Sequence, residues 1–98
     1  MSKSDTSFET YKTMVASTCH VTKEDLETLE METDIFSTVD HYYGTRVFLG
    51  EDLLQEMGQV SVSEGLEMLI LFAMSNGCLY LELDSDGPDY EKFPRYDW

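Results

Sequence analysis

The segment Glu64–Ser75 limits the possible folds most, because it is predicted to be a helix that is apolar on almost every side. Ser61 and Glu64 have the spacing of a capping box, and Asn76-Gly77 is typical of a helix end. A core-facing stripe at helical spacing comprises Val62, Leu66, Leu69, Ile70 and Ala73. The other large apolar side chains of this helix are Met68, Leu71, Phe72 and Met74. They belong either to a wide buried face or to a surface that contacts another protein.

A second helix is predicted to begin at Thr22, where Thr22 and Asp25 have capping-box spacing, and to end near Glu32. Its apolar stripe is thin and consists of Leu26, Leu29 and Met31. The acidic side chains of this helix are expected to face outward or to flank the stripe: Glu24, Asp25, Glu27, Glu30 and Glu32. Acids in the last turn oppose the helix dipole, so their presence calls for a reason other than local stability.

The remaining segments favour β-structure. Residues 11–18 and Cys78–Leu83 alternate in the manner of strands, and Ile35–Leu49 is predicted to be a hairpin in which Gly44 supplies a positive φ. In that hairpin Val39 and Val47 are expected to share one face, with Asp40 and Tyr42 on the other. The connection 50–60 is expected to contain a helical turn at residues 52–57.

The predicted order is therefore β-α-β-β-α-β. The simplest α+β fold with this order is a ferredoxin-like two-layer sandwich, in which two helices back an antiparallel sheet. Its open sheet face would carry an aromatic and acidic set: Tyr80, Glu82, Cys78 and members of the pair Asp40 and Tyr42. Residues 11–98 form one domain that includes an aromatic C-terminal tail, 84–98, whereas residues 1–10 are expected to be disordered.

Charge is the clearest guide to partners. The chain has 98 residues and a formal net charge of -14, and between Glu24 and Glu91 its only Lys or Arg is Arg46. Such a chain repels nucleic acid and anionic membranes and is attracted to basic surfaces. The first ten residues contain no apolar run, so we expect them to be neither a signal peptide nor a membrane span, and we expect the two cysteines to be free thiols in a reducing cytoplasm.

No motif predicts catalysis or a cofactor. Cys19-His20 places a thiol near a helix start, but no third group is visible in the sequence, so a structural role is favoured over a nucleophile. His20, His41, Cys19 and Cys78 lack the close pairs of a zinc site. We therefore expect a non-enzymatic protein without a catalytic, cofactor or metal site.

The run Glu82–Glu91 has oxygen ligands at alternate positions, as a calcium loop does. However, Phe93 stands where that loop needs a bidentate Glu, so a tight turn at Asp84–Pro88 explains the run better, and weak metal binding at Asp84 and Asp86 is left open. The rings of the tail are expected to dock back on the domain or, alternatively, to recognise a partner. They are Tyr90, Phe93, Tyr96 and Trp98.

Several short motifs resemble a family of small uncharacterised bacterial proteins that are often carried on plasmids and prophages. The resemblance lies in residues 17–22, the Tyr-rich hairpin around Gly44, residues 76–78, residues 84–88 and the terminal Phe-Pro-Arg-Tyr-Asp-Trp of residues 93–98. The family pattern is an S-T-x-H-I/V start, a D-x-D-G-P turn and an L-P-T-Y-D-W end, from which this chain departs at Phe93 and Arg95. The resemblance implies a mobile-element context and a bacterial cytoplasm, but no activity.

Two non-enzymatic functions remain open, and a third, enzymatic possibility would need Cys19 or His20 as its working group. The first is an inhibitor that occupies a basic, nucleic-acid-binding surface of another protein, as DNA mimics, anti-restriction proteins and anti-CRISPR proteins do. Its contact residues would be Glu24, Glu27, Glu30, Glu32, Asp34, Glu51, Asp52 and Glu56. The second is an adaptor that homodimerises or docks through Met68, Leu71, Phe72, Tyr90, Phe93, Tyr96 and Trp98.

Overall fold

The computed structural model describes residues 9–41 and 44–98. Within the segment 1–10, expected to be disordered, Glu9 and Thr10 are exposed and have no regular secondary structure; residues 1–8 lie outside the described residues. The elements are β1 (Thr13–Ser17), the 3₁₀ helix η1 (Thr18–His20), α1 (Lys23–Met31), β2 (Thr38–His41), β3 (Gly44–Phe48), α2 (Leu53–Met57), α3 (Glu64–Ser75) and β4 (Tyr80–Asp84).

The strands form one mixed sheet in the order β1-β4-β3-β2. β1 pairs in parallel with β4, whereas β3 pairs antiparallel with both β4 and β2. The protein is therefore α+β, as predicted, but the antiparallel ferredoxin-like sheet is not confirmed. The order of elements along a chain does not determine which strands pair, and β1 lies here at the edge of the sheet.

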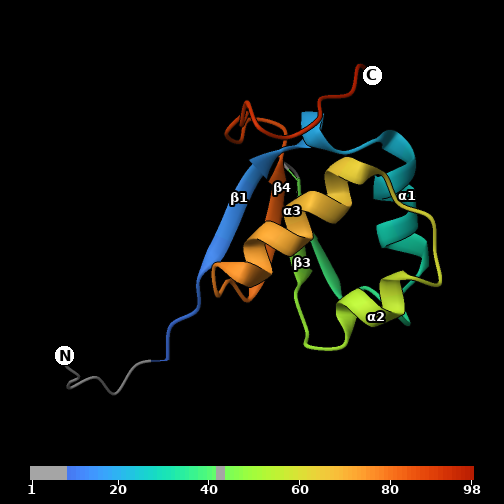
Figure 1. The fold of residues 1–98 in the computed structure, drawn as a ribbon, viewed down its shortest axis with the longest axis vertical. Coiled ribbons are helices and arrows are strands. Elements are labelled where there is room, and N and C mark those ends of the chain that lie inside the picture. Colours follow the sequence, from blue (N-terminus) through green and yellow to red (C-terminus); the bar gives the residue numbers. More distant parts are fainter. Residues whose placement is uncertain (1–8, 42–43) are drawn as a thin grey trace.

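The helices cover one face of this sheet (Figure 1), with α3 crossing β4 and β3 and with α1 and α2 beside it. Four strand residues on that face are fully buried: Ala16, Val47, Leu81 and Leu83. From α3 the core receives Leu66, Leu69, Ile70 and Ala73, as the helical spacing predicted. Val62 packs partly against the same core.

The hairpin differs from its prediction by one residue of register. Val39 pairs with Arg46 and is 65% exposed, so it does not share a face with the buried Val47. Asp40 pairs with Thr45 on the helix side, where its Oδ1 accepts a hydrogen bond from the Thr45 hydroxyl at 3.0 Å. Shifting the pairing of a strand by one residue moves each of its side chains to the other face of the sheet, and the alternation of polar and apolar residues in this hairpin does not determine which pairing forms.

The assignment of Gly44 to a turn with positive φ is also wrong. Gly44 is the first residue of β3, and among the described residues only Gly77 has a positive φ. Glycine is required at position 44 because a Cβ there would lie 1.8 Å from the carbonyl oxygen of Leu83 on β4. Tyr42 and Tyr43, and so the face of Tyr42, lie outside the described residues.

The open face of the sheet carries Tyr80 and Glu82, as predicted, together with Arg46 and Phe48. Cys78 does not belong to it. Cys78 precedes β4 and packs partly against the helix-side core.

The start of α1 has the predicted capping box between Thr22 and Asp25. Asp25, however, is only 2% exposed and does not face outward. Its Oδ1 accepts a hydrogen bond from the Ser63 amide at 2.9 Å, and its Oδ2 accepts one from the Ser63 hydroxyl. Ser63, rather than the predicted Ser61, is the N-cap of α3. One buried carboxylate therefore joins the starts of two helices, where both helix dipoles favour negative charge.

The other helix boundaries follow the sequence. α3 runs over the predicted range and has Asn76 at its C-cap, and the expected helical turn in the connection is α2. Met31 is 76% exposed and so does not extend the apolar stripe of α1. No described helix is of a length and hydrophobicity that would let it cross a bilayer.

Candidate acidic binding surface

Five of the predicted contact residues lie on α1 or directly after it. Glu24, Glu27 and Glu30 follow one another at a spacing of three residues, which makes successive side chains neighbours on the helix surface. Glu32 is the C-cap of α1, and Asp34 lies in the turn that follows. All five side chains are exposed.

The end of α1 is unfavourable for so many acids. No basic residue occurs in its last turn, and the nearby acids face the negative end of the helix dipole. The cost is of the order of 0.3–1 kcal/mol for each ill-placed charge. In the described part of the chain no ion pair offsets this cost.

The other three contact residues surround the start of α2. Glu51 and Asp52 are exposed, and Glu56 is half-buried. Asp52 is the N-cap of α2, yet its side chain accepts no capping hydrogen bond. Together with the apolar side chains of Ile35 and Phe48, these carboxylates line a shallow hollow.

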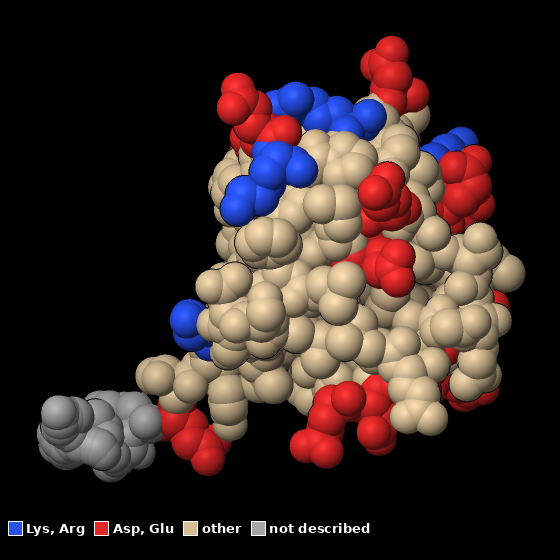
Figure 2. Space-filling model, in the orientation of Figure 1, with Lys and Arg blue, Asp and Glu red and all other residues tan. Residues whose placement is uncertain are grey.

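These eight residues of α1, α2 and the adjacent turns are termed here the acidic surface. None of them forms an ion pair with a Lys, Arg or His in the described part of the chain. Of the described cations, only Lys23 lies on α1 or α2. In the view of Figure 2 the carboxylates occupy several separate positions, and the lower edge, beneath α2, carries Asp and Glu without Lys or Arg.

Four of the five described Lys and Arg residues make contacts away from the acidic surface. Arg46 contacts Glu82 at 2.9 Å, and Arg95 contacts Asp89 at 2.7 Å. Two lysines make other contacts: Lys12 donates to the carbonyl of Asn76 at 2.8 Å, and the Lys92 ammonium lies 4.4 Å from the centre of a phenyl ring, that of Phe72. These four cations therefore make their contacts at the tail, at the open sheet face and at the end of α3.

The C-terminal tail docks on the domain, as expected, and His20 is its main anchor. His20 is completely buried. Its Nδ1 lies 2.7 Å from the carbonyl oxygen of Pro94, and its Nε2 accepts the amide of Tyr90 at 2.9 Å. Because a carbonyl only accepts and an amide only donates, these partners require the neutral tautomer with the proton on Nδ1.

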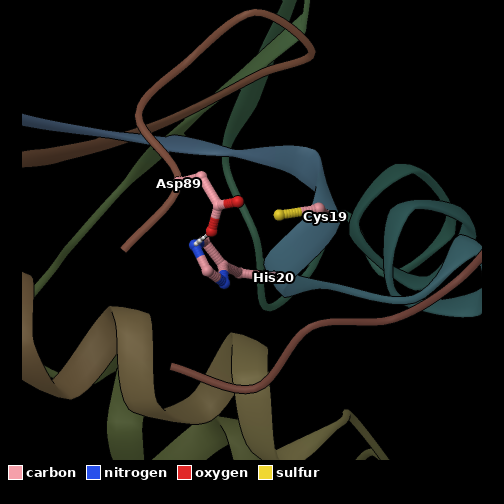
Figure 3. A group of neighbouring side chains, drawn as sticks. All are labelled: Cys19, His20 and Asp89. Atoms are coloured by element: carbon pink, nitrogen blue, oxygen red, sulfur yellow. Dashed lines mark ion pairs between the residues drawn. The ribbon is translucent and has the colours of Figure 1, made fainter. Parts of the chain in front are cut away.

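Cys19, His20 and Asp89 form a cluster that sequence analysis did not identify (Figure 3), because Asp89 comes from the tail. Asp89 Oδ1 lies 3.6 Å from His20 Nε2, and the potential ligand atoms of all three residues lie within 4.8 Å of one another. Composition alone would suit a Cys-His-Asp triad or a metal site.

The hydrogen bonds of His20 argue against both uses. A triad needs one ring nitrogen for the nucleophile and the other for the carboxylate, but here one is bonded to Pro94 and the other to Tyr90. A metal would need the lone pair that Nε2 already offers to the Tyr90 amide. The cluster is therefore best understood as a structural anchor. Cys78, the other cysteine considered as a zinc ligand, does not belong to this cluster and lies beside Met14 and Phe72.

Further contacts fix the rest of the tail. The Tyr96 amide donates to the carbonyl of Cys19 at 2.8 Å, and the Trp98 indole donates to the carbonyl of Val21 at 2.9 Å. The Tyr90 hydroxyl donates to the carbonyl of Val15 at 2.7 Å. Because β1 is an edge strand, this last contact also protects part of an exposed sheet edge.

Docking of the tail brings three residues of the alternative interface together: the Phe93 ring packs edge-on against Phe72 and Tyr90, with ring centres 5.2 and 5.9 Å apart. Phe93 is 4% exposed and belongs to the core, so it does not lie on the surface. Leu71 and Phe72 are 45% and 38% exposed, and Trp98 is 58% exposed. The other three, Met68, Tyr90 and Tyr96, are half-buried.

The acidic run after β4 forms the tight turn that the sequence favoured. Asp84 accepts two hydrogen bonds from amides of its own turn. The Asp86 amide donates to its side chain, and the Gly87 amide donates to its carbonyl oxygen.

Farther along the tail, the pKa of the Arg95 guanidinium is raised, chiefly by its hydrogen bond to Asp89.

Fold and surface together define a small acidic α+β domain in which eight carboxylates on and beside α1 and α2 have no cationic partner in the described part of the chain. The chain belongs to the family of unknown function DUF5983, whose C-terminal domain matches residues 13–98. No curated protein and no solved structure matches the chain.

Proposed function

We propose that this protein is a non-enzymatic inhibitor that uses the acidic surface to occupy a basic, nucleic-acid-binding surface of another protein. The observation that supports the proposal is the absence of ion pairs between the eight carboxylates and any described cation. A solvated acidic face that only maintains solubility would not need acids at the unfavourable end of α1.

The physical basis is competition for Lys and Arg. Duplex DNA carries one negative charge per roughly 1.7 Å of its axis, and helix-borne carboxylates offer a comparable array to the same cations. Steering by a net charge of -14 accelerates such an encounter and makes it sensitive to salt. Partners of this class include restriction enzymes, CRISPR complexes and other DNA-handling proteins of a bacterial cytoplasm, in keeping with a mobile-element origin.

The test is capture of partners from a bacterial lysate at low and at moderately raised salt, followed by elution with duplex DNA. A nucleic-acid-binding protein that is lost with salt and released by DNA supports the proposal. Substituting Lys for Glu24, Glu27 and Glu30 should abolish capture. A matched control, in which Lys replaces the exposed Asp86, Glu91 and Asp97, changes the net charge equally and should retain most of it.

Capture that survives both high salt and charge reversal on α1 would contradict the proposal. So would an equal loss with the control variant, because binding would then depend on total charge and not on the acidic surface.

A second candidate function is an adaptor or homodimer that uses the exposed part of α3. The observation in its favour is the neighbouring pair Leu71 and Phe72, both more than a third exposed. Its signature would be a concentration-dependent size in analytical ultracentrifugation that salt does not change.

A further inference from the structure

The hollow beside α2 has the composition of a receptor for a single basic side chain. Ile35, Phe48 and Leu53 supply its apolar lining, and Glu51, Asp52 and Glu56 supply its carboxylates. We propose that this hollow binds an arginine side chain of the partner protein. This inference rests on the proposed function and names the part of the acidic surface where specific recognition occurs.

The ring of Phe48 is the first reason for choosing arginine. It belongs to the open sheet face, is 40% exposed, and packs edge-on against Tyr80 with ring centres 5.9 Å apart. Gly50 adjoins this ring, because a Cβ at that position would lie 3.0 Å from Phe48 Cε2. A planar guanidinium stacks on such a ring more readily than an ammonium does.

Charge complementarity is the second reason. The three carboxylates have no cationic partner in the described part of the chain, and Asp52 is not consumed by capping α2. An arginine side chain has an apolar stem and a delocalised charge at its end. The stem would contact Ile35 and Phe48 while the guanidinium faced the carboxylates.

The hollow between α1 and the hairpin offers a comparison within the same molecule. It is lined by Leu26, Leu29, Glu30 and Asp40 among others, and so is also apolar and acidic. Its Asp40, however, already accepts a hydrogen bond from Thr45, and the described residues that line it include no aromatic ring. The hollow beside α2 is therefore the better receptor for a guanidinium.

The experiment is a titration of the whole protein with N-acetyl-arginine amide, followed by two-dimensional NMR. N-acetyl-citrulline amide serves as a neutral control of nearly the same shape, and N-acetyl-lysine amide as a cation without a planar head. We expect arginine to shift the signals of Ile35, Phe48, Gly50 and Leu53, with an affinity about threefold higher than that of lysine. Citrulline should cause no shift.

Two variants with the same change of net charge make the test specific. Replacing Glu51, Asp52 and Glu56 by Gln, Asn and Gln should remove the arginine-induced shifts. Replacing Glu24, Glu27 and Glu30 by Gln should leave them. Phe48→Leu, which retains an apolar side chain, should abolish the preference for arginine over lysine, and circular dichroism should confirm that each variant is folded.

Equal shifts with citrulline, no shifts with arginine, or an equal loss in both charge variants would overturn the inference. If in that case DNA-competed capture from the lysate persisted, the proposed function would stand and only the arginine receptor would fall. If capture also failed, both would fall.

Discussion

The C-terminal tail and the acidic surface are both rich in polar groups, but they differ in whether those groups have partners within the molecule. At the tail, His20 uses both ring nitrogens, and Tyr90, Tyr96 and Trp98 all donate to the main chain of other elements. On the acidic surface, none of the eight carboxylates has a described cationic partner. Satisfied polar groups explain the stability of a fold, whereas an unpaired array of one sign is available for a partner.

The largest loss of stability is expected on substitution of Asp25, the carboxylate on α1 that has hydrogen-bond partners inside the molecule. Asp25→Ala leaves the amides of Thr22 and Ser63 without acceptors in a buried site and should lower the free energy of unfolding by about 3–4 kcal/mol. Urea denaturation followed by circular dichroism measures this loss. The neighbouring Glu24→Ala, on the acidic surface, removes only an exposed charge of the first helical turn and should lower the free energy of unfolding by no more than about 1 kcal/mol. Equal losses at the two positions would contradict the distinction between carboxylates with and without partners inside the molecule.

The next effect is expected at His20. His20→Phe preserves an aromatic ring but leaves the Tyr90 amide and the Pro94 carbonyl unpaired, at an expected cost of about 2–3 kcal/mol. Amide hydrogen exchange should show faster exchange at Tyr90 and Tyr96 than in the unmodified protein. Unchanged protection of these amides would mean that His20 does not anchor the tail.

Adding a methyl group at Gly65 tests how closely α3 packs against His20 and the tail. Gly65 donates its amide to the Tyr96 hydroxyl, and a Cβ at this position would lie 1.9 Å from the carbonyl oxygen of His20. Gly65→Ala should therefore cost about 2 kcal/mol through overpacking, as measured by thermal and urea unfolding. Gly58→Ala provides a milder control, because its nearest contact would be 3.3 Å.

The smallest effect has the opposite sign. Replacing Glu27 and Glu30 by Gln relieves repulsion between neighbours on α1 and should raise the free energy of unfolding by about 0.5 kcal/mol at low salt. The gain should vanish in 0.5–1 M salt, where the Debye length is only about 3–4 Å. A loss of stability at low salt would show that these carboxylates have structural roles.

The elements with strong local signals were predictable. The capping box at Thr22, the range of α3 and its buried stripe, and the turn after β4 all agree with the sequence because each depends on residues close together in the chain. The strand partners were not predictable. The parallel pairing of β1 with β4 and the register of Val39 depend on contacts between distant segments.

The candidate site shows the same division. The eight acids of the acidic surface could be chosen from charge and helical position, and seven of them are exposed. The hollow could not be foreseen, because it brings together Ile35 and Phe48 from opposite sides of the hairpin with acids that adjoin α2. The hydrogen bond from the Phe48 amide to the Ser37 carbonyl holds these two sides of the hairpin together.

The sequence by itself determined the helices, the α+β class and the excess of negative charge, since these follow from local pattern and composition. Only the tertiary structure decided which polar groups form hydrogen bonds or ion pairs within the molecule. It buried Asp25 between two helix starts and His20 beneath the tail, while the eight carboxylates of the acidic surface form no ion pair with a described cation. The physical reason is that a hydrogen bond or an ion pair between residues far apart in the chain depends on the packing that brings them together.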